Sequence, residues 1–140
     1  LSNNLGFNLN SSAQVALNSL ISGMSFSVDG SSGLKGLPKS FASGDSGWLS
    51  DVELVFTPWV KEKKAIQILP FFGFGEVITD VQNTITKDSA GSYGLLLRYI
   101  NSNNVFEIGL ANFINTENNT GTWNNWMLGD GIFSNLKFTF

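Results

Sequence analysis

Residues 5–17 read L-G-F-N-L-N-S-S-A-Q-V-A-L and alternate apolar with polar side chains over most of their length. The apolar positions are Leu5, Phe7, Leu9, Ala13, Val15 and Leu17, and the polar positions include Asn8, Asn10, Ser12 and Gln14. A repeat of two residues is that of a β-strand, whose successive side chains point to opposite faces of a sheet. The stretch therefore predicts a strand with one apolar and one polar face.

Later segments of the chain repeat this pattern. The predicted strands lie near residues 5–18, 47–58, 65–77, 89–100, 104–115 and 131–140. Pro58 is expected to end the second strand, because proline has no N–H to donate to a neighbouring strand. Each strand is about as long as one that crosses a bilayer at a tilt. The predicted fold class is all-β, an antiparallel meander of about six long strands.

The connections between the predicted strands are alternately long and short. Long loops are expected at residues 19–46, 78–88 and 116–131, and short turns at 58–64 and 101–103. Transmembrane β-barrels combine long extracellular loops with short periplasmic turns, so the alternation favours a membrane barrel. The first loop contains residues 26–40, F-S-V-D-G-S-S-G-L-K-G-L-P-K-S, a glycine-rich excursion around Lys35. Loops of this length are usually functional or disordered.

Composition supports a membrane barrel but leaves an alternative open. Only 14% of the residues are charged, against roughly a quarter in soluble domains, whereas phenylalanine occurs 12 times. Uncharged polar side chains facing a water-filled interior, with aromatic side chains facing lipid, are typical of an outer-membrane barrel. Aromatic girdles are expected from Trp48 and Tyr93 near the long-loop ends, and from Trp59, Tyr99 and Phe140 near the short-turn ends. A soluble β-sandwich rich in asparagine and serine is the structural alternative.

Charge and residue usage exclude several classes of function. The net charge is -3, and Glu62 interrupts the one basic cluster of Lys61, Lys63 and Lys64, so nucleic acid is not an expected partner. Without cysteine or histidine, neither a disulfide framework nor a metal site or cofactor is expected. No apolar run approaches the ~18 residues of a transmembrane helix, so insertion would use strands. Because the chain opens at Leu1, we expect it to be the C-terminal part of a longer protein.

Several motifs, in order along the chain, resemble those of a known family. They are F-S-V-D-G at 26–30, L-K-G-L at 34–37, S-G-D-S-G-W at 43–48 followed by Glu53-Leu54, L-P-F-F-G-F-G at 69–75, and G-L-L-L-R-Y at 94–99. The last strand, with Leu136, Phe138 and Phe140 at alternate positions, is similar to the C-terminal β-signal of outer-membrane proteins. Together the motifs resemble the two-partner secretion exporters, the haemolysin and haemagglutinin secretion/activation (ShlB/FhaC/HecB) family, over nearly the whole chain.

The resemblance implies a 16-stranded transmembrane barrel preceded by periplasmic POTRA domains, with this chain forming its last six strands. Such a protein exports a large, mostly β-helical exoprotein across the outer membrane of a Gram-negative-type bacterium, without nucleotide hydrolysis. The C-terminus would face the periplasm, and the last strand would engage the barrel assembly machinery. The 26–40 loop would fold into the barrel as a pore plug or conformational lock, with its arginine paired to an aspartate of the barrel wall.

Two positions depart from the family pattern. The loop motif Gly33, Leu34, Lys35, Gly36 and Leu37 carries lysine in place of arginine, and Gly73 occupies the position of the wall aspartate. A cation in a confined lumen is costly without a counter-charge. We therefore expect Lys35 to pair with Glu53 or, as the second candidate, Asp51, because both project from the polar face of the neighbouring predicted strand. The alternative is a solvated loop lysine.

The predicted activity is passive translocation rather than catalysis. Inner faces rich in Asn, Gln, Ser and Gly would offer an uncharged polar track to an extended polypeptide, within a barrel surrounded by outer-membrane lipid. Asp51 and Glu53 have no opposing carboxylate for acid/base chemistry, so an enzyme is not expected. A general porin or structural barrel protein is the alternative function, and a soluble β-sandwich binding module is the second alternative.

Overall fold

The chain is all-β and antiparallel, in a computed structural model that describes residues 4–30, 32–37, 41–81, 84–115 and 132–138. The strands are β1 (Leu5–Gln14), β2 (Phe26–Val28), β3 (Ala42–Gly44), β4 (Ser46–Lys61), β5 (Lys64–Val81), β6 (Thr84–Asn101), β7 (Asn104–Asn115) and β8 (Ile132–Phe138), with a 3-10 turn η1 at Ser22–Met24. Six strands form one sheet in the order β1-β4-β5-β6-β7-β8, and β2 pairs with β3. Among the described residues no helix is long and apolar enough to cross a membrane.

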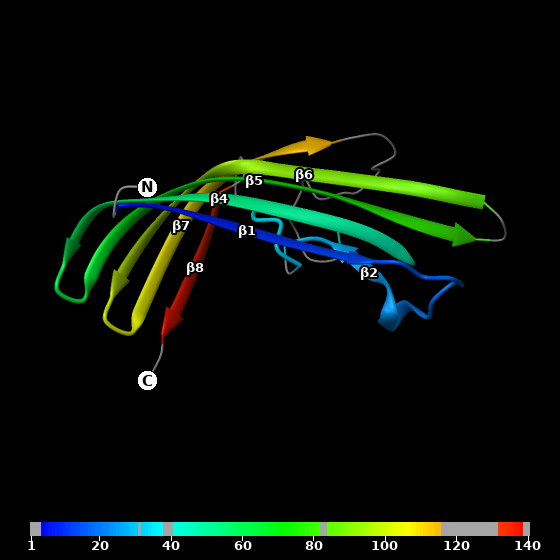
Figure 1. Ribbon diagram of the computed structural model, residues 1–140, viewed down its shortest axis with the longest axis horizontal. Coiled ribbons are helices and arrows are strands. Elements are labelled where there is room, and N and C mark those ends of the chain that lie inside the picture. The colour runs from blue at the N-terminus through cyan, green and yellow to red at the C-terminus, as the bar shows by residue number, and fades with distance from the viewer. Residues whose placement is uncertain (1–3, 31, 38–40, 82–83, 116–131, 139–140) are drawn as a thin grey trace.

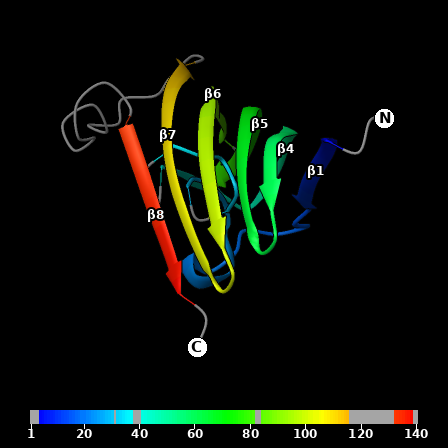
Figure 2. The same ribbon diagram turned by 90° about the vertical axis from the view of Figure 1, so that its left-hand side faces the viewer.

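The large sheet is curved and open. Figure 1 shows β4, β5 and β6 arching over β2 and η1, which lie on the concave side. Figure 2 shows the six strands side by side from β8 to β1, which form the two edges of the sheet. The prediction of an antiparallel meander of six long strands is confirmed, and the sheet does not close into a barrel.

The convex face of the sheet is apolar and exposed. Alternate positions on every long strand place large apolar side chains there, including Phe7, Leu9, Leu54, Phe56, Phe72, Leu95, Leu97, Phe106, Ile108, Leu110, Ile132 and Leu136. Exposed apolar side chains in one continuous band differ from the scattered ones of ordinary soluble surfaces. The convex face is thus an extended apolar surface that the described chain leaves uncovered.

The central part of the concave face is buried by the first loop. Val28, Leu34 and Leu37 of the loop pack with Leu49, Val77 and Ala90 of the sheet, and a second apolar cluster contains Leu69, Phe71, Leu96 and Ala111. The expectation of an uncharged polar track is wrong beneath the loop, where the wall is apolar and also carries the buried carboxylates of Asp51 and Glu53. The physical reason is that the loop, rather than water, covers this surface.

Three strand boundaries differ from the sequence prediction. Pro58 does not end β4, because a register shift between Phe56 and Trp59 accommodates it and pairing resumes to Lys61. Residues 78–88 are not a long loop, since β5 and β6 stay paired as far as Val81 and Thr84. The strict alternation of long and short connections is therefore wrong at this hairpin, whose β-branched residues favour extended backbone. Tyr93 consequently lies midway along β6, opposite Phe72, rather than near its end.

Other predicted features are shorter than expected or fall outside the described residues. β1 ends at Gln14 because the chain leaves the sheet there, and the Ala16 N–H donates to Ser46 Oγ over 2.9 Å. The predicted 19–46 loop contains η1, β2 and β3. The predicted 116–131 loop and Phe140 of the β-signal lie outside the described residues, whereas Leu136 and Phe138 lie on β8 with exposed side chains.

Candidate functional site

The candidate site is the loop tip, residues 33–37, where it lies on the concave wall. A compact turn precedes this segment. The Ser32 N–H donates to Asp29 Oδ1 over 2.8 Å, and the Leu34 N–H donates to the Asp29 carbonyl over 3.1 Å. Aspartate favours such turns because its side chain accepts a hydrogen bond from the backbone close by. The turn therefore fixes where the loop tip begins.

The loop tip is seated in spaces that small residues leave. Leu34 is fully buried, and a Cβ built on Gly73 would lie 2.5 Å from Leu34 Cδ2. Gly36 has a φ of 83°, and a Cβ there would overlap the Cβ of Ala111 on β7. The loop tip thus crosses the wall from β5 to β7, and the space above Gly73 is filled by a leucine. An aspartate side chain in place of Gly73 would collide with Leu34 in this docked position.

Lys35 is held by two carboxylates of β4. Its Nζ lies 2.9 Å from Asp51 Oδ1 and 2.7 Å from Glu53 Oε1, and it sits 5.8 Å from the centre of the Phe71 ring. Asn8 Nδ2 of β1 donates to the other oxygen, Glu53 Oε2, over 3.1 Å. Both carboxylates proposed from the sequence as partners of Lys35 contact it, so it is not a solvated loop lysine. Asp51 lies directly opposite Gly73 in the pairing of β4 with β5.

The electrostatics of the site keep Lys35 charged. Burial favours the neutral amine and lowers the pKa of Lys35, but the hydrogen bonds and charges of Glu53 and Asp51 outweigh this and hold it above its ordinary value of 10.5. A group whose pKa is raised on folding contributes its stability fully below the unfolded value and loses it as pH rises through the folded value. The contact between Lys35 and the wall should therefore persist to above pH 10.5.

Docking of the loop tip should accordingly be insensitive to pH between neutrality and about pH 10. The chain contains no cysteine, so a single cysteine replacing the buried Leu37 reports undocking through its reaction rate with a methanethiosulfonate reagent. The rate is divided at each pH by that of Leu17→Cys, whose parent side chain is 93% exposed. A constant ratio is expected up to about pH 8, because above that pH ionisation of the buried probe thiol itself favours the undocked loop tip. A ratio that rises already between about pH 6 and 8 would show that Lys35 loses its proton early and would contradict the electrostatic account.

Sequence reasoning missed two contributors to this site, Asn8 and Phe71. Both belonged to predicted strands, but their roles depend on register, because Glu53 lies opposite Asn8 on β1 and opposite Phe71 on β5. Only the pairing of those strands brings the three side chains together. Knowing that β1 pairs with β4 over the intervening loop would have revealed Asn8.

A second polar group crosses the concave wall nearer the short turns. Arg98 on β6 pairs with Glu107 on β7 and donates to Gln67 Oε1 on β5 over 3.3 Å, while Asn135 Nδ2 on β8 donates to Glu107 Oε2 over 3.1 Å. These side chains form hydrogen bonds and an ion pair with one another, in a row across four strands. They are therefore better suited to stiffening the wall than to binding a separate ligand.

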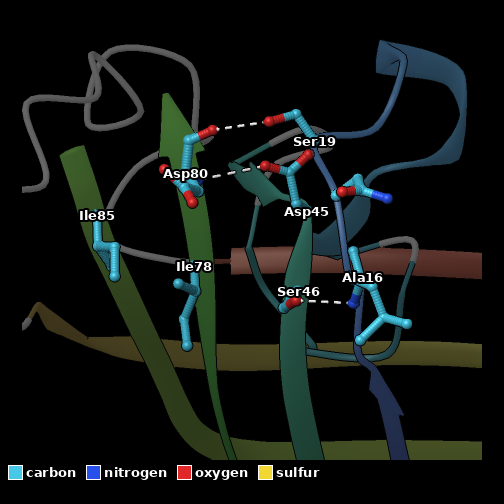
Figure 3. A pocket seen from close by; sticks show the side chains of 9 residues that line it. Ala16, Ser19, Asp45, Ser46, Ile78, Asp80 and Ile85 are labelled. Carbon is cyan, nitrogen blue, oxygen red and sulfur yellow. Dashed lines mark hydrogen bonds between the residues drawn. The ribbon is translucent and has the colours of Figure 1, made fainter. Parts of the chain in front are cut away.

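A cavity of about 200 Å³ lies at the long-loop end of the sheet, between the segment after β1 and the tips of β5 and β6 (Figure 3). Asp45 orders it, since its carboxylate accepts the Leu20 N–H over 2.7 Å and the Asp80 N–H over 3.2 Å. Ser19 Oγ also donates to the Asp80 carbonyl over 3.0 Å. Asp45 thus acts as a structural clamp, and no cluster of potential metal ligands occurs among the described residues.

Fold and site together define an antiparallel sheet with one apolar exposed face and a loop ion-paired to its other face. Comparison of the chain with protein-family models, with curated proteins and with solved structures finds no match. The function is therefore inferred from the geometry, with the motif resemblance as its second support.

Proposed function

We propose that the chain is the C-terminal part of an outer-membrane β-barrel translocator that exports a large secreted protein by two-partner secretion. The 26–40 loop acts as a plug or conformational lock of the pore, and the complete barrel has 16 strands. The observation that carries this proposal is the loop tip itself: Lys35 is paired with Asp51 and Glu53 on the concave face of a sheet whose convex face is apolar. A pore-lining wall with an inserted loop requires these two opposite surfaces.

The dimensions of the convex face support insertion in a membrane. Trp59 lies opposite Ile66 and Trp48 lies opposite Glu76, so about ten residues of β5 separate the two tryptophan levels. With a rise of ~3.4 Å per residue and a strand tilt of ~40°, this distance along the barrel axis is about 25 Å. The apolar band of outer-membrane barrels has the same height and is also bordered by aromatic side chains.

The two sheet edges and the position of the C-terminal strand support the same proposal. β1 and β8 each present one unpaired edge in the described chain, and further strands of a barrel would pair with them. Phe138, the last residue of β8, lies opposite Asn104 at the β6–β7 turn. Short turns face the periplasm in such barrels. In this orientation the end of β8 lies on the periplasmic side, where the assembly machinery can bind it.

The proposal is tested with the complete gene product in planar bilayers and in cells. We expect the wild type to insert and stay mostly closed, and Lys35→Glu to raise its open probability at least tenfold, because a third carboxylate would then face Asp51 and Glu53. Lys87→Glu is the matched control, because it makes the same charge change at an exposed lysine. The Lys87 Nζ lies 3.7 Å from Glu76 Oε1, outside the loop tip. Secretion of the partner protein from cells should depend on the gene product.

The failures of this test have different meanings. A protein that remains monomeric in buffer without detergent would exclude any membrane barrel and favour the soluble binding module. Insertion with the same open probability for wild type and Lys35→Glu would instead favour a porin or structural barrel, in which the loop is not a lock.

A further inference from the structure

The convex face ends, at the short turns, in a row of hydrogen-bond donors. Lys61 lies opposite Lys64, Lys64 opposite Asn101, and Asn101 opposite Asn104, so one donor comes from each of β4, β5, β6 and β7. We call these four residues the donor row. Both lysine side chains are exposed. The row points to the convex side, because each member is an even number of residues from Trp59, Ile66, Tyr99 or Phe106 on its own strand.

The two lysines of the donor row are an unfavourable pair as they stand. Side chains directly opposite each other in antiparallel strands have Cβ atoms about 5 Å apart, and like charges at such positions are destabilising. Neither Lys61 nor Lys64 forms an ion pair within the described part of the chain, where the salt bridges join Lys35, Lys87 and Arg98 to carboxylates. An external anion placed between the two ammonium groups would relieve their repulsion.

The neighbouring residues indicate which anion this is. The next row inward on the convex face contains Trp59, Ile66, Tyr99, Phe106 and Leu136, so the donor row directly borders the apolar band. Aromatic side chains in this position mark the level of the lipid headgroups, and lysine side chains beyond them extend toward the headgroup phosphates. Lysine ammonium and asparagine amide groups are donors suited to phosphate oxygens.

We propose that the donor row binds the phosphate groups of anionic phospholipids in the leaflet at the short-turn end of the sheet. This rests on the proposed function, because lipid contacts the convex face only if the sheet is part of a membrane barrel. The ammonium groups of Lys61 and Lys64 both contact the singly charged phosphodiester, and the amides of Asn101 and Asn104 extend the row of donors along the bilayer surface. Glu62 and Lys63 form the turn itself, outside the strand pairing.

The test measures lipid affinity of the complete gene product in detergent by native mass spectrometry. Phosphatidylglycerol and phosphatidylcholine are titrated separately, and we expect tighter binding of phosphatidylglycerol. Lys61→Gln/Lys64→Gln should weaken its binding about thirtyfold, since each lysine near an anionic surface contributes a factor of roughly five. The matched control is Lys63→Gln/Lys137→Gln, which removes the same charge at the same end but outside the donor row. It should weaken binding less than threefold.

Other results would overturn the lipid site. An unchanged phosphatidylglycerol affinity in Lys61→Gln/Lys64→Gln would do so, as would equal losses in both double variants, which indicate non-specific attraction. Displacement of the lipid by inorganic phosphate at about 10 mM, where screening by the added salt is weak, would assign the row to a free anion instead. Insertion into vesicles is scored separately by resistance to urea extraction. A wild type that fails to insert contradicts the proposed function, whereas an inserted wild type without lipid preference contradicts only the donor row.

Discussion

Lys35→Met should raise the reaction rate of the Leu37→Cys probe by about two to three orders of magnitude. Lys35 is the only cation bound to Asp51 and Glu53 among the described residues, and the Asp51 side chain is 4% exposed. Removing one partner of a buried ion pair costs about 3–5 kcal/mol, because the other charge is left without compensation. Here two carboxylates would face each other beneath an apolar side chain. The undocked state of the loop tip, in which water reaches both carboxylates, therefore becomes far more populated.

Lys35→Met should nevertheless leave the loop tip docked most of the time. Leu34 and Leu37 are both buried, and burying such a side chain stabilises by about 1.5–3 kcal/mol. The neutral triple variant Lys35→Met/Asp51→Asn/Glu53→Gln should then recover slow labelling, to within about tenfold of the wild type. Replacing all members of a buried ion pair by neutral groups is often nearly neutral in stability.

Lys87→Met provides the control for general effects of removing a lysine. Lys87 pairs with Glu76 at 3.7 Å with a side chain that is 62% exposed, and surface pairs of this kind contribute little. Labelling should change by less than twofold. Equal labelling rates for Lys35→Met and Lys87→Met would mean that the ion pair does not hold the loop tip, and that apolar packing alone does.

The sequence predicts the sheet well because each long strand alternates over a half-apolar surface. The alternation of residues 47–58 correctly assigns Asp51 and Glu53 to one face of β4, since side chains two residues apart share a face whatever the register. Asp51 and Glu53 therefore share the polar face of β4, and a buried lysine needs a counter-charge. These two arguments together pair Lys35 with β4. The choice between the two carboxylates is not predictable, because it depends on where Lys35 lies between them.

Features that depend on contacts between distant segments could not be predicted from local pattern. Pro58 reads as a strand end, but a register shift in pairing with β5 retains it within β4. Residues 78–88 lack apolar alternation and indicate a loop, whereas cross-strand pairing keeps residues 78–81 and 84–88 extended. The apolar side chains of Leu49 and Val77 on the concave face do not fit the polar pore lining that the sequence predicts. They are explained by the loop, whose apolar side chains pack on them. In each case tertiary pairing overrides the local signal.

Gly36→Ala should displace the loop tip more severely than any conservative change of an apolar side chain around it. The φ of 83° is in the left-handed region, which costs a residue with a Cβ about 1–2 kcal/mol. The new methyl group would also overlap the Cβ of Ala111, a backbone-fixed atom that cannot rotate away. Both penalties disappear when the loop tip leaves the wall. Labelling of the Leu37→Cys probe should therefore increase at least a hundredfold, from a combined cost of about 3 kcal/mol.

Ala111→Gly separates the two penalties. In the double variant Gly36→Ala/Ala111→Gly the overlap is removed while the backbone strain persists, so labelling should return only part of the way to the wild-type rate. Gly23→Ala is the matched control, because Gly23 lies outside the loop tip and a methyl group added there would meet nothing within 4 Å. It should leave the rate unchanged. If Gly36→Ala labels slowly and Ala111→Gly has no effect on it, the loop tip does not pass against β7, and the position assigned to Lys35 between Asp51 and Glu53 would be wrong.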